Sequence, residues 1–322
     1  MTEKKQSAFY PGKVWLDNNE KSIQAHGGCV IYINGTYYWY GEDKGGITIS
    51  GEHVGCGHRV DVIGIHCYSS IDLYNWKDEG LVLCAVEDNP EHDLHVSRVV
   101  ERPKVVYNNK TNQYVMWLHI DKSDYCYART GVAISSSPTG PFEYRGSFQP
   151  NEHDSRDFTI FKDSDNKTYL FHSSEWNKTL YINELTENYL NVTNQYSRNF
   201  VEQSRESPAV FKYENYYYII TSGCTGWEPN AAQYAISQSI VGPWSVIGNP
   251  CVGEKADKTF FAQSTYVLPV EGMKGAFIMM LDLWTPDDLG NSRYVWLPIK
   301  IAGEKIQIEW IEKWDLSIFH SL

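Results

Sequence analysis

The stretch that decides the fold is residues 206–220, ESPAVFKYENYYYII. It starts with polar residues, Glu206-Ser207-Pro208, continues as an apolar strand, and reaches turn-forming residues at Glu214-Asn215 before a second strand rich in tyrosine. Asn, Asp and Gly tolerate the positive φ that a tight hairpin needs, so the pattern predicts two antiparallel strands joined by a short turn.

Four further copies of this pattern occur along the chain. Their polar starts are Ala25-His26-Gly27-Gly28, Glu101-Arg102-Pro103, Arg156-Asp157 and Gln263-Ser264. Their turn-forming residues are Asn34-Gly35, Asn108-Asn109, Asp163 to Asn166 and Glu271-Gly272. Successive starts lie 49 to 75 positions apart, a spacing that suits a four-stranded propeller blade. The repeat predicts an all-β fold, a five-bladed β-propeller, in which the five polar starts gather around one axis.

The outer strands repeat as well, which sets the expected domain organisation. Three segments share a strand followed by a turn and an aromatic residue: 65–76, 132–142 and 234–244. A propeller grows by adding blades, so a chain of 322 residues can form one unit. We expect a single domain over residues 1–322, with blades at approximately 22–96, 97–151, 152–202, 203–257 and 258–316. No long segment has a helical period, so few helices are expected.

Composition limits the partners. The net charge of -12 argues against a nucleic-acid backbone, which binds clustered Lys and Arg. No apolar run is long enough for a membrane span and no signal peptide is recognisable, so no membrane association is expected, and the compartment is either the cytoplasm or that of a trimmed secreted protein. Seven cysteines without a CxxC pair are expected to be reduced core residues rather than a disulfide framework. The sequence does not specify an oligomeric state.

Three of the polar starts carry acids: Glu101, Asp157 and Glu206. Hydrolysis of a glycoside needs a protonated carboxyl group beside the leaving oxygen and, for inversion, a second group that activates water. Crowding of like charges raises the pKa of one acid, so that it can stay protonated near neutral pH. For any single acid, a strand-start residue bonded to backbone is the commoner explanation. A carbohydrate-binding propeller without turnover also remains open.

An arginine adjoins each of these acids: Arg102, Arg156 and Arg205. Neighbours in an extended strand point to opposite sides, so each arginine is expected to pin the adjacent blade rather than to pair with the acid beside it.

The chain resembles glycoside hydrolase family 43, and within it the exo-acting galactan 1,3-β-galactosidases. The resemblance runs from about residue 24 to 314 and rests on five motifs: Gln24-Ala25-His26-Gly27-Gly28, Glu101-Arg102-Pro103-Lys104-Val105, Ser155-Arg156-Asp157, residues 221–227 (TSGCTGW) and residues 287–298 (DDLGNSRYVWLP). The resemblance implies a five-bladed propeller that hydrolyses glycosides with inversion.

The resemblance also implies roles for individual residues. Glu206 matches the general acid and Asp157 the residue that tunes it. The family's Asp base on the first blade is missing, since His26-Gly27-Gly28 stands there, and Gln263 matches a glutamine proposed to position the water. A neutral amide has almost no basicity near pH 7, so Gln263 either holds the water while another group takes the proton or relays the proton through its imidic tautomer. Glu101 is the competing base, or it grips a sugar hydroxyl.

Galactose presents an axial hydroxyl and an apolar C–H face, which favours a pocket with an aromatic platform and polar groups. The residues expected to contact the sugar are His26, Tyr125, Asn177, Thr225, Trp227 and Trp284. For any single aromatic residue, core packing is the commoner role, and a hydrogen-bonded core position is the commoner role for His26. No cofactor is required and no metal site is predicted, although a central structural ion is possible because ions occur in relatives.

The predicted function is release of galactose from the non-reducing end of β-1,3-galactan, with a polysaccharide or oligosaccharide as the partner. The resemblance leaves open an arabinofuranosidase or a β-xylosidase of the same family. A binding propeller that has lost turnover with its Asp base is the alternative from another class.

Overall fold

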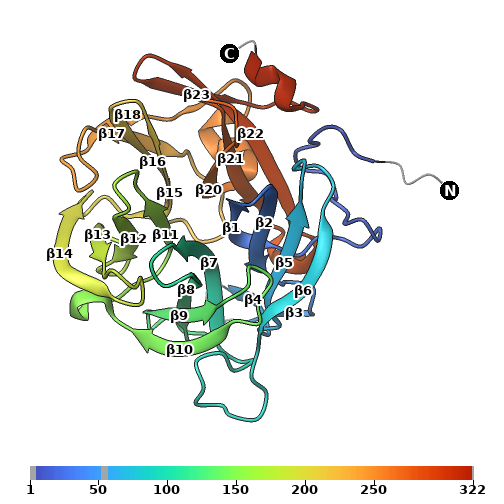
Figure 1. The fold of residues 1–322 in the computed structure, drawn as a ribbon, viewed down its shortest axis with the longest axis vertical. Coiled ribbons are helices and arrows are strands. Elements are labelled where there is room, and N and C mark those ends of the chain that lie inside the picture. Colours follow the sequence, from blue (N-terminus) through green and yellow to red (C-terminus); the bar gives the residue numbers. More distant parts are fainter. Residues whose placement is uncertain (1–4, 52–56, 321–322) are drawn as a thin grey trace.

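The computed structural model describes residues 5–51 and 57–320. Five sheets are arranged around a central axis, with β1, β7, β11, β15 and β20 as their innermost strands (Figure 1). The fold is a five-bladed β-propeller, as the repeat predicted. None of the helices among the described residues is long and apolar enough to span a bilayer.

The first sheet has the order β1-β2-β5-β6, and the second has the order β7 to β10 from the axis outward. The strands of the first sheet are β1 (His26–Ile33), β2 (Thr36–Glu42), β5 (Gly64–Ser70) and β6 (Lys77–Cys84). A two-stranded hairpin, β3 (Thr48–Ser50) with β4 (His58–Val60), lies between β2 and β5 in the sequence. The strands of the second sheet are β7 (Val99–Asn108), β8 (Gln113–Asp121), β9 (Arg129–Ser135) and β10 (Glu143–Phe148).

The third and fourth sheets repeat this order. The strands of the third are β11 (Phe158–Lys162), β12 (Thr168–Ser174), β13 (Thr179–Leu185) and β14 (Val192–Asn199). Those of the fourth are β15 (Arg205–Tyr213), β16 (Tyr216–Gly223), β17 (Gln233–Ser237) and β18 (Ser245–Gly248).

The short 3-10 helices among the described residues are η2 (Pro150–Glu152), η3 (Ala256–Phe261), η4 (Pro286–Asn291) and η5 (Leu316–His320).

The fifth sheet has one additional strand. Its order is β19-β23-β22-β21-β20, with β19 parallel to β23 at the outer edge. The strands are β19 (Cys251–Val252), β20 (Gln263–Pro269), β21 (Phe277–Leu283), β22 (Arg293–Ala302) and β23 (Lys305–Glu309). Strand β19 falls within the range expected for the fourth blade, but it pairs in the fifth sheet. After β18 the chain therefore reaches the outer edge of the next sheet before η3 leads it to the axis.

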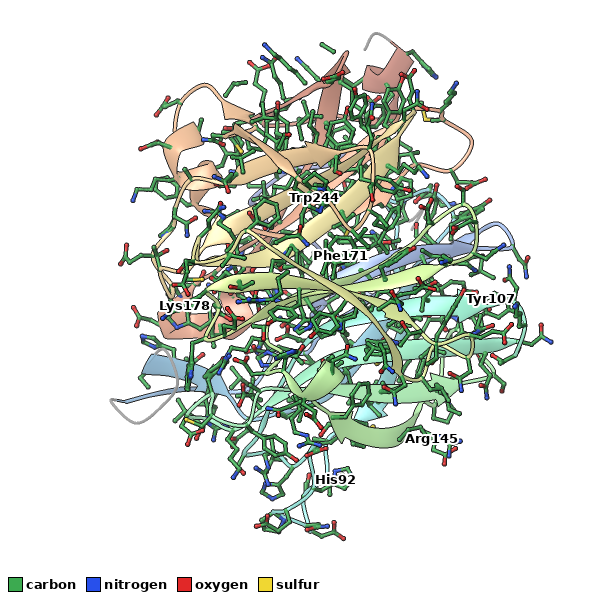
Figure 2. All side chains as sticks on the ribbon, turned by 90° about the vertical axis from the view of Figure 1, so that its left-hand side faces the viewer. His92, Tyr107, Arg145, Phe171, Lys178 and Trp244 are labelled. Atoms are coloured by element: carbon green, nitrogen blue, oxygen red, sulfur yellow. The ribbon has the colours of Figure 1, made fainter. Side chains whose placement is uncertain are left out.

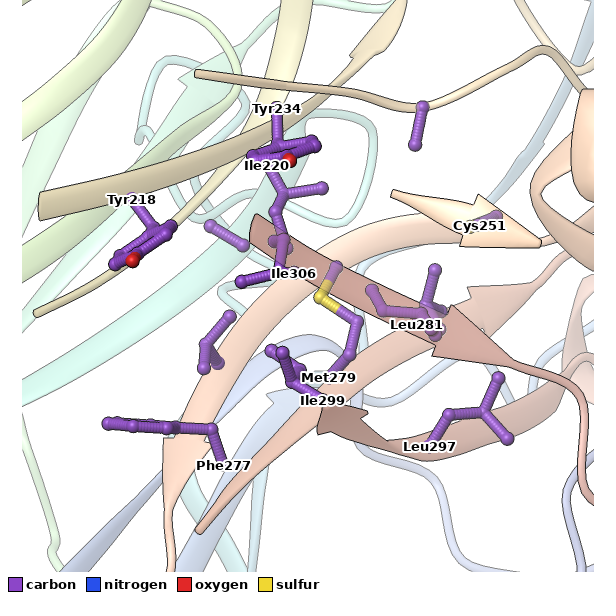
Figure 3. Packing of buried hydrophobic residues seen from close by; sticks show 14 of the residues in the cluster. Tyr218, Ile220, Tyr234, Cys251, Phe277, Met279, Leu281, Leu297, Ile299 and Ile306 are labelled. Carbon is purple, nitrogen blue, oxygen red and sulfur yellow. The ribbon is translucent and has the colours of Figure 1, made fainter. Parts of the chain in front are cut away.

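The apolar core lies between neighbouring blades. Five clusters of buried side chains each join two adjacent sheets. The seam between the fourth and fifth sheets shows the principle: Phe211, Tyr218 and Ile220 pack against Phe277 and Met279 (Figure 3). Side chains alternate between the two faces of a strand, so one tyrosine-rich strand serves two seams. Phe171 and Trp244 lie inside another seam, while Lys178 and Arg145 point to the periphery (Figure 2).

The ring closes between the fifth and first sheets through aromatic packing. Trp39 of the first sheet lies 4.8 Å from Trp296 of the fifth, between ring centroids. Phe9, ahead of the first sheet, exchanges backbone hydrogen bonds with Trp314, which follows the fifth. These contacts fix the first blade against the last, which a site shared by all blades requires. The cysteines among the described residues are free thiols. Cys29, Cys67 and Cys251 are buried as expected, whereas Cys84, Cys126 and Cys224 are exposed and do not belong to the core.

Candidate active site

The inner strands share a local irregularity at the end where the site forms. Register shifts occur at His26/Cys29, Glu101/Lys104, Glu206/Ala209 and Ser264/Tyr266. A bulge adds a residue to one strand and redirects the side chains beside it. Arg102 and Ser207 accordingly have positive φ, 55° and 52°. Glu101 and Arg102 therefore both line the cavity, which strict alternation along the strand would forbid.

A cavity of about 340 Å³ lies at this end of the propeller, lined by residues of all five blades. Its walls hold Glu101, Asp157, Glu206 and Gln263 from four different inner strands or the residues just before them. The volume falls in the range of small-molecule sites. The four residues expected to be catalytic thus meet in one cavity.

Arg102 connects the blades at the centre of this cavity. Its guanidinium binds Asp157 through two bonds, Nε to Oδ1 at 3.0 Å and Nη2 to Oδ2 at 2.8 Å. Nη2 also donates to Gln263 Oε1 at 2.7 Å and to Ser207 Oγ at 2.8 Å. A planar guanidinium holds its partners in fixed directions, so Arg102 sets the relative positions of Asp157 and Gln263.

The arginines differ from one another in what they contact. Arg102 pins the next blade through Asp157, as predicted. Arg156 donates to the carbonyl of Tyr125 on the preceding blade at 3.1 Å, and it also pairs with Asp154. Arg205 remains on its own sheet, where it donates to Thr221. The expectation for Arg205 was wrong because the adjacent strand of the same sheet presents acceptors within its reach.

Glu206 has the environment of a protonated acid. Burial, the largest cause, and the negative charge of Asp157 raise its pKa to about 8. Crowding of acids was predicted to raise the pKa, whereas burial contributes more. Gln263 Nε2 donates to Glu206 Oε1 at 3.0 Å, and Asn177 Nδ2 donates to Oε2 at 3.3 Å. Two amides therefore orient the carboxyl group towards the cavity.

Gln263 is held by four hydrogen bonds. Its amide oxygen accepts from Arg102 and, at 3.1 Å, from Trp284 Nε1. Its nitrogen donates to Glu206 and, at 3.2 Å, to Ser222 Oγ. These bonds use both lone pairs of the oxygen and both hydrogens of the nitrogen. The amide orientation is therefore specified, and the oxygen faces a cation.

Glu101 lies in the opposite electrostatic environment. Burial by itself raises its pKa, but contact with His119 at 3.4 Å and the charges of Lys44 and Arg102 outweigh burial and bring the pKa to about 2. His119 also contacts Asp121 at 3.1 Å, and the two carboxylates raise the pKa of His119 to about 9 against the effect of burial. Tyr125 donates its hydroxyl to Glu101 at 3.0 Å. Glu101 is thus an ionised carboxylate near neutral pH.

Glu42 occupies the space beside Gly27 on the first blade. A Cβ atom at Gly27 would lie 2.2 Å from Glu42 Oε1, and the φ of Gly27 is +62°. Glu42 accepts the backbone N–H of Arg102 at 2.9 Å and pairs with Lys44 at 2.7 Å. Gly27, in the segment where the resemblance places a first-blade Asp, thus makes room for a carboxylate from the neighbouring strand β2.

Aromatic side chains form part of the cavity wall. Tyr125, Trp227 and Trp284 are half-buried there, and the rings of Trp227 and Trp284 meet edge to face at 5.7 Å. Asn177 lines the same wall. Among the residues expected to contact the sugar, these four lie on the cavity.

Two of the residues expected to contact the sugar are not part of the wall. His26 is fully buried and bonds Asp282 at 3.0 Å, in the core role weighed against sugar contact. Thr225 is exposed and donates to the carbonyl of Glu228, which shapes the loop that carries Trp227.

Sequence reasoning missed two wall residues, Glu42 and Lys44. The available signal was their position directly after the second strand of the first copy, at the same end as the polar starts. A search for polar residues at the ends of the second strands would have found both.

Glu101, His119 and Asp157 have ligand atoms within 4.8 Å of one another, a grouping that could hold an ion. The donors are already engaged, however. Both oxygens of Asp157 bind Arg102, and the raised pKa of His119 keeps its ring protonated, a form that cannot ligate a metal. An ion held by these three residues would have to replace the contacts to Arg102 and the proton on His119.

A five-bladed propeller with carboxyl groups gathered at one end of its axis is the architecture of a class of glycoside hydrolases. The sequence model described as "Glycosyl hydrolases family 43" matches residues 29–264. The chain belongs to this family. No curated protein sequence matches the chain.

Several solved structures are similar over nearly the whole chain. The family 43 β-1,3-galactosidase designated BT0265 is 40% identical with a TM-score of 0.91, over 98% of this chain and 65% of its own. A second, BT3683 with galactodeoxynojirimycin, is 39% identical with a TM-score of 0.88, over 96% of this chain and 100% of its own. The exo-β-1,3-galactanase of Phanerochaete chrysosporium with β-1,3-galactotriose is 34% identical with a TM-score of 0.87, over 97% of this chain and 68% of its own. The chain thus spans less than two thirds of BT0265.

Proposed function

We propose that the protein is an exo-acting glycoside hydrolase that releases galactose from the non-reducing end of β-1,3-galactan with inversion. The observation that carries the proposal is the pairing of Glu206, whose pKa is raised to about 8, with Gln263 across one cavity at the propeller axis. The similar structures support the substrate class, because those described above are β-1,3-galactosidases or exo-β-1,3-galactanases.

Glu206 is the general acid in this proposal. It is protonated at neutral pH and can deliver its proton to the glycosidic oxygen as the bond to the anomeric carbon breaks. Burial and the charge of Asp157 disfavour the carboxylate form of Glu206, so the acid keeps its proton until negative charge develops on the glycosidic oxygen that accepts it.

Asp157 and Arg102 tune and align this acid. The Asp157 charge contributes to the raised pKa of Glu206, whereas Arg102 opposes it. Arg102 binds both Asp157 and Gln263, and Gln263 in turn donates to Glu206. The general acid and the amide therefore keep fixed positions relative to each other during the reaction.

In this proposal the attacking water takes the place of one of the four hydrogen-bond partners of Gln263, and Glu101 assists in removing the proton of that water. The Gln263 oxygen accepts from a guanidinium, which lowers the basicity of an amide that is already a poor base. Glu101 is ionised and lines the same cavity, so it is the stronger proton acceptor. A carboxylate also suits the grip of a sugar hydroxyl. No step in this proposal passes through a metal ion.

The experiment that tests the proposal is incubation with debranched β-1,3-galactan, with released sugars and their anomeric form followed by proton NMR. Inversion predicts α-galactose as the first product and single galactose units from the start of the reaction. Release of arabinose or xylose from other polymers, without galactose from galactan, would redirect the assignment within the family. Binding of galactan in calorimetry without any released sugar would identify a binding propeller.

A further inference from the structure

Trp176 is exposed to an unusual degree for an indole on a cavity wall. It lies in the turn between β12 and β13, lines the cavity, and exposes 65% of its surface. The other aromatic side chains of the wall are half-buried. Single exposed apolar side chains are common on protein surfaces, so the position of Trp176 on the cavity wall and the way its ring is held decide whether it can bind a ligand.

The turn that carries Trp176 is built to hold an unfavourable backbone. Glu175, Trp176 and Asn177 all have left-handed φ, at 53°, 57° and 62°. Residues other than glycine rarely adopt this conformation, and it persists only where surrounding contacts impose it. Three such residues in succession indicate that the direction of the Trp176 side chain is imposed by the surrounding structure.

Asp154 supplies the contacts that impose this backbone. Its carboxylate accepts the N–H of Glu175 at 2.7 Å, the N–H of Trp176 at 3.1 Å and the hydroxyl of Ser174 at 2.8 Å. These bonds outweigh burial and lower the pKa of Asp154 to about 2, so the carboxylate stays ionised. Asp154 also pairs with Arg156, whose guanidinium lies 4.4 Å from the Trp176 ring centroid.

Arg156 covers part of the indole and leaves most of it open to the cavity. A cation held over one face of the ring fixes the ring orientation. The open surface is then a flat apolar platform, which suits the C–H face of a pyranose. The asymmetry of the ring environment is what distinguishes Trp176 from an ordinary exposed side chain.

The position of this platform relative to the acid indicates which sugar it contacts. Asn177, the next residue, donates to Glu206, which must reach the glycosidic oxygen. Arg102 and Asp157 are buried and Gln263 is half-buried, so the proposed function places the galactose to be released beside these three residues. The rest of the chain must leave across the rim, where Trp176 lies.

We propose that Trp176 is the platform for the leaving-group galactose, the sugar on the reducing side of the bond to be cleaved. The inference rests on the proposed function and adds a specificity-determining residue to it. Binding energy from this second sugar then helps the reaction at the bond rather than only holding the substrate.

The experiment compares two substrates that share the released galactose. β-1,3-Galactobiose has a sugar leaving group, and β-galactosyl fluoride has none. We expect Trp176→Ala to lower kcat/KM for galactobiose by roughly tenfold and to leave the fluoride within about twofold. Trp176→Phe keeps a ring and should recover part of the loss. Tyr32→Ala, which removes an exposed ring on β1 outside the cavity, should change neither.

The outcomes separate the inference from the function it rests on. Equal losses on both substrates with Trp176→Ala, or no loss on galactobiose, would overturn the platform. If the unaltered protein releases galactose from neither substrate, the proposed function fails. Calorimetry then still tests the platform, since Trp176→Ala should weaken binding of galactobiose and not of galactose; equal weakening, or none, would refute it.

Discussion

Glu206 and Glu101 are the same type of residue at the same place in two blades, yet they have opposite protonation. Glu206 is bonded by amides and lies near Asp157, and its pKa is about 8. Glu101 faces protonated His119 and Lys44, and its pKa is about 2. Both carboxyl groups lose hydration, so the charge of the neighbours determines the difference. A proton donor and a stable anion can therefore occur within one cavity.

The comparison predicts the largest effect for the loss of the proton donor. Glu206→Gln keeps the shape and the bond to Gln263 but has no proton to transfer, so kcat on β-1,3-galactan should fall by about 10³-fold. Hydrolysis of β-galactosyl fluoride, whose leaving group needs less assistance, should fall much less. Steady-state kinetics on both substrates provide the measurement. An equal loss on the two would mean that Glu206 does not act as the acid.

Removal of the Gln263 amide should have the next largest effect. Gln263→Ala removes the group that we assign to the water, and kcat should fall by about 10²-fold. Gln263→Glu places an anion beside Glu206, so the pKa of Glu206 should rise and the alkaline limb of the pH profile should move to higher pH. Retained turnover in Gln263→Ala would exclude the proposed role of Gln263. If Glu101→Gln is inactive while Gln263→Ala stays active, water activation is assigned to Glu101.

Loss of the protonated His119 tests why Glu101 is ionised. His119→Gln removes the protonated ring that lowers the pKa of Glu101, so this pKa should rise and kcat/KM below pH 5 should fall by about tenfold. The thermal midpoint must be followed in parallel, because His119 is buried with Asp121. A variant with normal stability and an unchanged acid limb would show that the ionisation of Glu101 does not matter for the reaction.

The smallest expected effect is a shift in the pH profile. Glu206 is protonated below its raised pKa and loses its proton above it, so kcat/KM should fall as the pH rises through about 8. Asp157→Asn removes a charge that raises this pKa, and the limb should move to lower pH by about one unit. The matched control is Asp165→Asn, which removes a charge in the exposed turn after β11 and should leave the limb in place.

The fold could be predicted from the sequence because each blade repeats the same local pattern. The polar starts, the turns and the tyrosine-rich strands follow from strand periodicity and turn chemistry. Strand β19 escaped this reasoning, since two residues carry no periodicity and their parallel partner β23 is distant in the sequence.

The site was predictable only in part, because some of its residues reach the cavity through tertiary packing rather than through the repeated pattern. The convergence of Glu206, Asp157, Gln263 and Glu101 follows from the repeat. The central position of Arg102 does not, because it depends on a bulge at a left-handed residue that breaks the side-chain alternation. Glu42 entered the site because Gly27 leaves space for it, which is a tertiary packing effect that no local pattern records.

The most direct test of the opposite protonation is infrared difference spectroscopy at pH 6.5, comparing the unaltered protein with Glu206→Gln and Glu101→Gln. The carbonyl stretch of a protonated carboxylic acid should disappear with Glu206→Gln and persist with Glu101→Gln. An unaltered protein that lacks this band, or one that loses it with Glu101→Gln instead, would contradict the assignment of the two carboxyl groups.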